Sequence, residues 1–405
     1  MIWRRGVSLW LVLLIALSLL VVGCGGKAPE PSNKAEVKPI KIGLLTLQTG
    51  ALEAYGKQQE AGFRLGLEYA TGGKMQVAGR PIVLVVKDDE GKPDVAKAKI
   101  EEMVTKDKVD IMAGGVSSAS AVAVLPLLEE YKKVMVVEPA VADSITGAAW
   151  NKYVFRTGRN SSQDAEAGAA AIAKPGVKIS ILAQDYVFGR DGGAALKRAA
   201  EKRGAKIVQE QYVPMNATDF TPYIQKIISE KPDYLYIIWA GANSPWKAIM
   251  DLKLMEKGIK ISTAAADIPA LKAMKDMVGM EGFAIYYYEL PKNAINDWLV
   301  VKHKEKYGTP PDLFTGGGFA AAVAIVEALK KTDGDTNSDK LIAAMEGMSF
   351  DSPKGKMTFR KEDHQALQTL YAIKLTKKEG YDYAVPALIR ELSPDETAPP
   401  ITNKR

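Results

Sequence analysis

The sequence is poor in cysteine and histidine, with one cysteine and two histidines among its 405 residues. Because Cys24 is the only cysteine, the chain can form no internal disulfide, and because the body of the chain beyond it has no cysteine, no cysteine–histidine pair and no thiolate metal site can form there. His303 and His364 each stand among charged residues, which is typical of an exposed helix or turn. The glycine runs at 114–115 and 316–318 lack the lysine and hydroxyl residue of a phosphate-binding loop. These absences argue against an enzyme and predict no metal and no cofactor.

The sequence also lacks a dense basic run interleaved with aromatic residues, so nucleic-acid binding is not expected. Its 54 Lys and Arg residues against 48 Asp and Glu residues leave a formal net charge of +6. A composition with 47% apolar and 25% charged residues is that of an ordinary soluble globular protein. A chain of 405 residues is long enough for two domains with full cores.

The N-terminus has the pattern of an export signal. Arg4 and Arg5 precede the largely apolar run Val7–Val22, and small residues follow it. The ending Val21-Val22-Gly23-Cys24 resembles a bacterial lipobox, in which the cysteine is lipid-modified and becomes the first mature residue. We therefore predict a signal peptide at 1–23 and a lipidated, flexible tether at 24–38, rich in Gly, Pro, Lys and Glu. The alternatives are a plain signal anchor and a signal that is cut elsewhere.

Beyond the tether, apolar strand-like runs alternate with helical patterns, which is typical of doubly wound α/β layers. The series occurs twice. The predicted strands of the first series are Ile40–Leu47, Pro81–Lys87, Val109–Ala113 and Val134–Glu138, and those of the second are Lys178–Ala183, Lys206–Val213, Tyr234–Trp239 and Lys260–Ala264. The sequence therefore predicts two lobes, each built on a parallel sheet.

The strand Val109–Ala113 is followed by two glycines and then by Ser117 and Ser118, which open a helix. In an open parallel sheet this places hydroxyl and backbone N–H groups at the carboxyl end of a strand, where such folds bind ligands. The alternative is that one of these serines only caps its own helix. Tyr55 and Phe188 each precede a glycine at the start of a helix, one in each half, and predict aromatic cover for an apolar ligand in a cleft.

Several stretches in fixed order together resemble a known family. They read IKIGLLTLQTGALEAYGKQQEAGFRLGLEYA, GRPIVLVVKDDEGKPDVAKAKIEEMV, KVDIMAGGVSS, NKYVFRTGRNSSQDA, DYVFGRDGGAALKRAAEKRGAKIV and ATDFTPYIQKI. They resemble the branched-chain amino acid (Leu/Ile/Val)-binding proteins, which are type I periplasmic solute-binding proteins of ABC importers. The resemblance covers most of residues 40–375.

The resemblance implies two lobes joined by a three-segment hinge, which close on a small ligand and deliver it to a membrane permease and its ATPase. Lobe 1 would hold 39–157 and 289–357, lobe 2 would hold 158–288 and 358–393, and 394–405 would be a flexible tail. The protein would be a monomer in the cell envelope, held on the outer face of a bacterial membrane by lipid on Cys24.

The resemblance also implies roles for particular residues. The serine that grips the ligand carboxylate falls at Ser117 or Ser118. The head-group loop, Ser-Pro-Ala-x-Thr in the family, reads Glu138-Pro139-Ala140-Val141-Ala142-Asp143 here, so Ala140, Ala142 and Asp143 fall in the site and the threonine is missing. The aromatic cover residues fall at Tyr55 and Phe188, and Trp239 lies in a further loop of the site.

Asp267 falls where the family receives the ligand ammonium, and the alternative is that it caps the next helix. With Asp267 in the site we expect an amino acid ligand, most simply an apolar or branched one, because a buried carboxylate needs a cationic partner. A second hypothesis keeps the fold but binds an aromatic or other small carboxylic acid, with Arg159 as a bidentate anchor. Arg159 as a solvated hinge residue remains open, as does a different class of function, a ligand-sensing receptor domain.

Overall fold

The computed structural model describes residues 37–241, 243–264 and 267–404. Within them, the chain from Lys38 onward forms one compact unit. The predicted signal peptide, Cys24 and nearly all of the tether lie outside the described residues. None of the helices in the described ranges combines the length and apolarity that a membrane span requires.

The first sheet has the strand order β2-β3-β1-β4-β5-β6, and all its neighbouring strands are parallel except β2 and β3. Its strands are β1 (Ile40–Thr46), β2 (Gln76–Val77), β3 (Arg80–Asp88), β4 (Ile111–Gly114), β5 (Met135–Val137) and β6 (Val154–Arg156). The helices α1 (Glu53–Ala70), α2 (Pro93–Glu102) and α3 (Ser118–Glu130) connect them, and α9 (Ala294–Tyr307), α10 (Thr315–Lys331) and α11 (Ser338–Met345) come from far along the chain. Apolar runs such as that of β1 are buried on both faces because helices cover them.

The second parallel sheet has the order β10-β9-β7-β8. Its strands are β7 (Lys178–Gln184), β8 (Lys206–Val213), β9 (Tyr234–Ile238) and β10 (Lys260–Thr263), with helices α4 (Ser161–Ile172), α5 (Val187–Lys202), α6 (Thr221–Ser229), α7 (Trp246–Asp251) and α8 (Ile268–Ala273). The predicted α/β class with parallel sheets is therefore confirmed. Ligand-binding loops of such sheets lie at the carboxyl ends of the strands.

Two small antiparallel sheets complete the described fold. One contains β11 (Glu281–Ala284), β15 (Leu370–Thr376) and β16 (Val385–Leu392), and the other contains β12 (Ser349–Ser352), β13 (Gly355–Phe359) and β14 (Ala366–Leu367). The sequence pattern does not predict β16. In β16 the residues 386–391 are mostly exposed, so its pattern resembles that of a loop.

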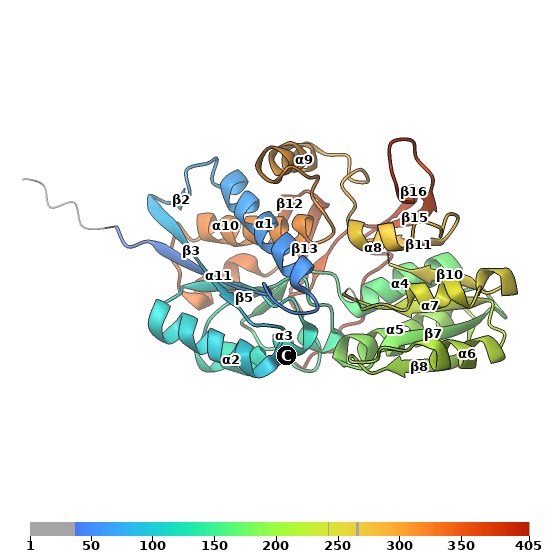
Figure 1. Cartoon of the computed structure of the whole chain (residues 1–405). Coiled ribbons are helices and arrows are strands. Elements are labelled where there is room, and N and C mark those ends of the chain that lie inside the picture. The colour runs from blue at the N-terminus through green and yellow to red at the C-terminus, as the bar shows by residue number, and fades with distance from the viewer. Residues whose placement is uncertain (1–36, 242, 265–266, 405) are drawn as a thin grey trace, which may run out of the picture. The chain divides into compact units, whose positions relative to one another are not determined.

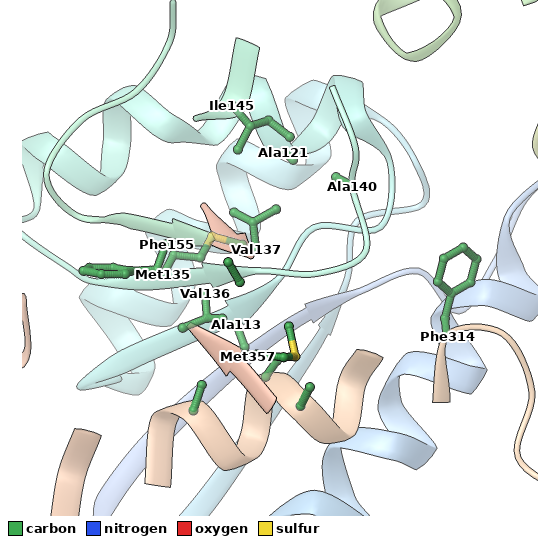
Figure 2. Close-up of a cluster of buried hydrophobic side chains, with 14 of the residues drawn as sticks. Ala113, Ala121, Met135, Val136, Val137, Ala140, Ile145, Phe155, Phe314 and Met357 are labelled. Atoms are coloured by element: carbon green, nitrogen blue, oxygen red, sulfur yellow. The ribbon is translucent and has the colours of Figure 1, made fainter. Parts of the chain in front are cut away.

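The core beneath the first sheet is built from small and branched side chains. Figure 2 shows Val136 of β5 and Ala113 of β4 on the side of the sheet that faces Met357, with Ala121 and Ile145 on the opposite side. Met135 and Val137 flank Val136 along β5, and all three are completely buried. Alternate side chains of one strand thus enter two separate apolar layers.

Helices α1 and α10 pack against each other at glycines (Figure 1). A Cβ atom on Gly62 would collide with the backbone oxygen of Thr315, and one on Gly318 would collide with the backbone oxygen of Gln59. The triple glycine at 316–318 therefore serves close helix packing, as its sequence suggested. This contact fixes the N-terminal end of α10, which begins next to the ligand cavity described below.

Both histidines are buried, so the expectation that they are exposed is wrong. His364 is 0% exposed, stacks on Phe155 with ring centroids 3.9 Å apart, and lies 3.1 Å from a carboxylate oxygen of Glu346 through Nε2. His303 is 7% exposed, and its Nδ1 lies 2.7 Å from the backbone oxygen of Thr309. The charged residues next to His303 extend to solvent while its ring turns inward, and the Asp363 carboxylate next to His364 is itself buried in an ion pair with Arg360, so neighbouring charges did not indicate exposure.

The expected flexible tail is in contact with the body of the protein over the residues that the structure describes. Residues 394–404 contain no helix or strand, yet Thr397 is 1% exposed. Arg360 Nη1 donates to the backbone oxygen of Pro399 at 2.8 Å, and Asn403 Nδ2 donates to that of Glu362 at 2.9 Å. The proline-rich composition correctly indicated the lack of regular structure, but it carries no information about tertiary contacts.

We predict that Gly62→Ala destabilises the protein. Alanine favours a helix over glycine by about 1 kcal/mol, but overpacking a tight contact costs about 1–3 kcal/mol, and here the neighbour is rigid backbone. Urea unfolding should give a net loss of roughly 1–2 kcal/mol for this variant. Lys57→Ala, on the exposed face of the same helix, serves as the control and should change the free energy of unfolding by less than about 0.5 kcal/mol. A Gly62→Ala protein as stable as the wild type would contradict this packing.

Candidate ligand-binding site

A cavity of about 800 Å³, including the part open to solvent, lies where loops of both parallel sheets meet. Its walls come from the loops that follow β4, β5, β6, β7, β9 and β10, together with the first turn of α1 and the segment just before α10. Carboxyl-end loops of parallel strands are the usual location of ligand sites in such folds, and this volume suits a small molecule.

Ser118, and not Ser117, lines this cavity. Ser118 is the first residue of α3, and its Oγ accepts hydrogen bonds from the backbone N–H groups of Val141 and Ala142, both at 3.2 Å. Its own hydroxyl hydrogen is therefore left to donate into the cavity. Ser117 stands at the N-cap position of α3 but makes no side-chain capping bond. The capping alternative thus holds for neither side chain.

Arg159 is the one charged side chain among the described residues that line the cavity. It is 8% exposed, which rules out the solvated-hinge alternative. Its Nε donates to Asp164 Oδ1 at 3.1 Å, and its Nη1 donates to the backbone oxygen of Pro139 at 3.3 Å. Its Nη2 makes no hydrogen bond with any residue that the structure describes. The guanidinium is thus held on two sides and open on the third.

Aromatic side chains form much of the remaining wall. Tyr55, Phe188 and Trp239, which the sequence predicted for the site, all line the cavity. The structure adds Tyr186, Trp246 and Phe314, which the sequence did not predict. Tyr186 had a signal, since it lies two residues before Phe188 in the same loop, whereas Phe314 comes from a distant segment that no local pattern connects to the site.

The tyrosine hydroxyls remain hydrogen-bond donors at all ordinary pH values. Burial raises the pKa of Tyr55 and that of Tyr186 above the usual range for the phenol. Tyr55 Oη accepts a hydrogen bond from the backbone N–H of Gly241 at 3.2 Å, which leaves its hydrogen available. The cavity therefore presents hydroxyl donors and one cation to whatever it holds.

The head-group loop reaches the cavity with only part of its predicted residues. Ala140 lines it, together with Pro139 and Val141. Ala142 and Asp143 do not: the carbonyl of Ala142 accepts a hydrogen bond from Arg156, and the Asp143 carboxylate accepts from the N–H and Oγ of Ser162. The loop turns away from the cavity after Val141, so the Ala142 carbonyl and the Asp143 carboxylate bind Arg156 and Ser162 instead.

Asp267 also lies outside this cavity. It is 5% exposed, stands at the N-cap position of α8 and borders an adjoining groove that shares Tyr55, Gly241 and Ala270 with the cavity. Burial raises its pKa. It stands one residue before the helix but makes no side-chain capping bond, so only its position agrees with the alternative that it caps this helix.

Asp312 connects three segments beside the cavity. Its carboxylate oxygens accept hydrogen bonds from the N–H of Ile268 at 3.1 Å, the N–H of Leu313 at 2.8 Å and Gln58 Nε2 at 3.1 Å. Burial, with a further contribution from the negative charge of Asp267, raises the pKa of Asp312 to about 7. This carboxylate joins α1 to α8, which belong to different sheet layers.

Among the described residues there is no group of three or more His, Cys, Asp or Glu side chains with the geometry to hold a metal ion. The chemistry available at the cavity is therefore that of its donors, its one cation and its aromatic faces. Such groups bind a small anion with an apolar body.

Residues 39–380 match the periplasmic binding protein family. The chain is 25% identical over 367 residues to Leu/Ile/Val-binding protein homolog 6 of Brucella abortus (strain 2308), covering 87% of this chain and 91% of the relative. It resembles the crystal structure of an ABC-type branched-chain amino acid transporter from Rhodopseudomonas palustris CGA009, with 52% identity, a TM-score of 0.81 and coverage of 90% of this chain and all of the other. A solute-binding protein of an ABC transporter from Rhodopseudomonas palustris BisB5, solved with 3,4-dihydroxybenzoic acid, is 30% identical, with a TM-score of 0.77 and coverage of 88% and 97%.

The raised pKa of Asp312 predicts a pH dependence of stability. Because the folded state holds this proton more tightly than the unfolded state, the contribution of Asp312 is fully present below about pH 4 and is lost as the pH rises through about 7. Relative to Asp312→Asn, the wild type should lose roughly 1–3 kcal/mol of unfolding free energy between pH 5 and pH 8.

Urea unfolding of both proteins at several pH values measures this difference. Buried carboxylates that do not interact with Asp312 titrate equally in the two proteins and cancel, and placing Asp267→Asn in both proteins removes the contribution of Asp267, whose charge acts on Asp312. If the unfolding free energies of the wild type and Asp312→Asn change equally with pH between pH 5 and pH 8, Asp312 is ionised in the folded state throughout this range.

Proposed function

Since the chain belongs to the periplasmic binding protein family and is a solute-binding protein of the ABC-transporter type rather than an enzyme, we propose that it binds a small carboxylic acid in the cavity around Ser118 and Arg159. The ligand carboxylate accepts hydrogen bonds from Ser118 Oγ and Arg159 Nη2. The aromatic side chains enclose its apolar part.

The observation that carries this proposal is the combination of free donors, one cation and aromatic walls in a single cavity. Arg159 Nη2 and the Ser118 hydroxyl both have hydrogens available. An ion pair between a guanidinium and a carboxylate is stronger in such a water-poor site than in bulk water. Flat aromatic faces stack best on a flat ligand. We therefore favour an aromatic carboxylate, the second hypothesis of the sequence analysis.

An apolar or branched amino acid is the second candidate, supported by the names of relatives of this chain. The original assignment of its ammonium to Asp267 is weakened, because that carboxylate does not line the cavity. An amino acid in this cavity needs another acceptor for its ammonium group.

Ligand binding is proposed to close two lobes, with 39–157 and 289–357 in one and 158–288 and 358–393 in the other. Two hydrogen bonds between the proposed lobes support closure over the cavity: Gly241 N–H to Tyr55 Oη at 3.2 Å, and Ile268 N–H to Asp312 at 3.1 Å. The closed protein, a monomer, would then deliver its ligand to a permease and ATPase.

We further propose export by the signal at 1–23 and anchoring through lipid on Cys24, as the lipobox-like ending at Cys24 supports. A lipid-anchored binding protein near its permease suits import better than the alternative, a receptor domain that senses a ligand for a membrane kinase. The family match to periplasmic binding proteins agrees with an extracytoplasmic location.

The carboxylate assignment is tested with Arg159→Gln and Ser118→Ala. Loss of a charged hydrogen bond should weaken benzoate binding by about 10- to 100-fold for Arg159→Gln, and loss of the serine donor by about tenfold or less. Calorimetric titration of refolded, ligand-free protein measures both.

Asp267→Asn is the control, because Asp267 lies outside the cavity, and it should bind benzoate as the wild type does. If Asp267→Asn instead abolishes binding of leucine or valine while Arg159→Gln leaves it intact, the ligand is an amino acid held at Asp267 and our assignment is wrong.

The anchor is tested by Cys24→Ala in a bacterial host. The wild type should incorporate radiolabelled palmitate and sediment with membranes, because a diacylated N-terminus binds membranes stably. The variant should lose the label. Equal labelling of the two proteins would exclude Cys24 as the lipidated residue.

A further inference from the structure

A second compartment of about 430 Å³ adjoins the ligand cavity on the other side of Arg159. The two spaces share Arg159, Phe188, Trp239, Thr263 and Ala264 as common walls. The second compartment adds Ser161, Asp164 and Ala165 of α4 and Tyr236 of β9. The ligand site therefore includes more space than the first cavity, where the residues predicted from the sequence lie.

The hydroxyl groups that line the second compartment donate their hydrogens to backbone oxygens of the protein. Ser161 Oγ donates to the backbone oxygen of Val141 at 3.0 Å, and Thr263 Oγ1 donates to that of Ile237 at 2.8 Å. Tyr236 Oη donates to the backbone oxygen of Asp164 at 3.4 Å. What these groups still offer toward the compartment is lone pairs, which accept hydrogen bonds.

Asp164 adds a charged acceptor to the same compartment. Its Oδ1 accepts the hydrogen bond from Arg159 Nε, and its side chain is 15% exposed. Its Oδ2 accepts no hydrogen bond from any residue in the described ranges. A carboxylate oxygen that is largely shielded from water and unpaired has a strong tendency to bind a donor from a ligand.

The two compartments thus have opposite hydrogen-bonding character. The first presents the hydrogens of Ser118, Tyr55 and Arg159 Nη2, which suit a carboxylate. The second presents the oxygens of Ser161, Thr263 and Asp164, which suit a hydroxyl or an ammonium group. Arg159 lies between them and contacts both.

We propose that the ligand carries a hydrogen-bond donor besides its carboxylate, and that Asp164 Oδ2 accepts a hydrogen bond from this donor in the second compartment. The ligand class is a hydroxylated aromatic acid or an amino acid, which share this chemistry. The proposal rests on the proposed function, because it takes the carboxylate to be bound at Ser118 and Arg159. It makes Asp164 the residue that selects against acids without a donor.

Asp164 also orients Arg159, and the experiment has to separate these two roles. A residue that only positions Arg159 affects all carboxylate ligands equally. A residue that receives the donor affects only ligands that have one. The asparagine variant keeps a carbonyl oxygen for Arg159 Nε but places an N–H₂ group, a donor, where Oδ2 was.

The test is calorimetric titration of refolded full-length mature protein with benzoate, 3-hydroxybenzoate, 4-hydroxybenzoate and phenylalanine. The wild type should bind at least one donor-bearing acid about 10- to 100-fold more tightly than benzoate, the range for a hydrogen bond to a charged group. The hydroxybenzoates and phenylalanine distinguish a hydroxyl from an ammonium ligand.

In Asp164→Asn the ratio between the affinities for the preferred donor-bearing acid and for benzoate should fall to about one, whatever the change in benzoate affinity itself, because the Asp164–Arg159 contact acts equally on every carboxylate. Glu166→Gln is the matched control: it removes a carboxylate two residues away on α4 that pairs with Arg203 and lines neither compartment. It should keep the wild-type preference. A second variant, Ala165→Val, narrows only the second compartment and should weaken the donor-bearing acids but not benzoate.

Equal loss of benzoate and of the donor-bearing acids in Asp164→Asn would overturn the proposal and leave Asp164 as a positioning residue for Arg159. So would a wild type that binds benzoate as tightly as the hydroxylated acids and phenylalanine. A wild type that binds none of these acids would instead refute the proposed function, and the role of Asp164 with it.

Discussion

The buried guanidinium of Arg159 is the feature on which the rest of the site depends. A cation that is removed from water is costly unless it is paired and hydrogen-bonded. Arg159 donates hydrogen bonds to the Asp164 carboxylate and to the backbone oxygen of Pro139, which offset this cost. Its guanidinium carbon also lies 5.8 Å from the centroid of the Phe314 ring. One side of the guanidinium has no partner among the described residues. An anion that binds there completes the solvation of a group that the fold holds rigidly in place.

Buried contacts around the Pro139 loop, whose backbone oxygen accepts a hydrogen bond from Arg159, fix the position of the guanidinium. Pro139 follows Glu138, whose fully buried carboxylate accepts from Thr157 Oγ1 at 3.3 Å. Burial raises the pKa of Glu138, and the nearby positive charge of Lys354, itself buried, opposes this rise. Gly317 of α10 leaves the space that the Glu138 side chain occupies, since a Cβ there would overlap it. The position of α10, which packs closely against α1, thus constrains the Glu138 carboxylate and, through it, the Pro139 loop that contacts Arg159.

The sequence predicted the parts of this structure that follow from local pattern. Apolar runs alternating with helical spacing gave the strands and helices of both parallel sheets, because such runs are buried wherever they occur. Ser118, Tyr55 and Phe188 line the cavity as expected, because each lies in the first turn of a helix that follows a strand. Local pattern did not determine which of Ser117 and Ser118 faces the cavity, because a shift of one residue along a helix turns the side chain by about 100°.

The predictions of site residues failed for residues several positions beyond a strand end, and for residues that come from distant segments of the chain. Asp143 and Asp267 each lie a few residues past a strand end, and the direction of the loop, which residue types do not determine, turns them away from the cavity. Phe314 was missed because nothing in the sequence connects it to Arg159, about 155 positions earlier, whereas Asp164, only five positions after Arg159, was missed for a different reason. Asp164 in particular sits in the first turn of a helix, where an acidic residue is ordinary.

The most direct test of the account is a crystal structure of the mature protein with 4-hydroxybenzoate. The account predicts that the ligand carboxylate lies within hydrogen-bonding distance of Ser118 Oγ and Arg159 Nη2, with the ring among Tyr55, Phe188 and Trp239. A ligand bound elsewhere, or one whose carboxylate does not contact Arg159, would contradict the claim that this buried cation organises the site.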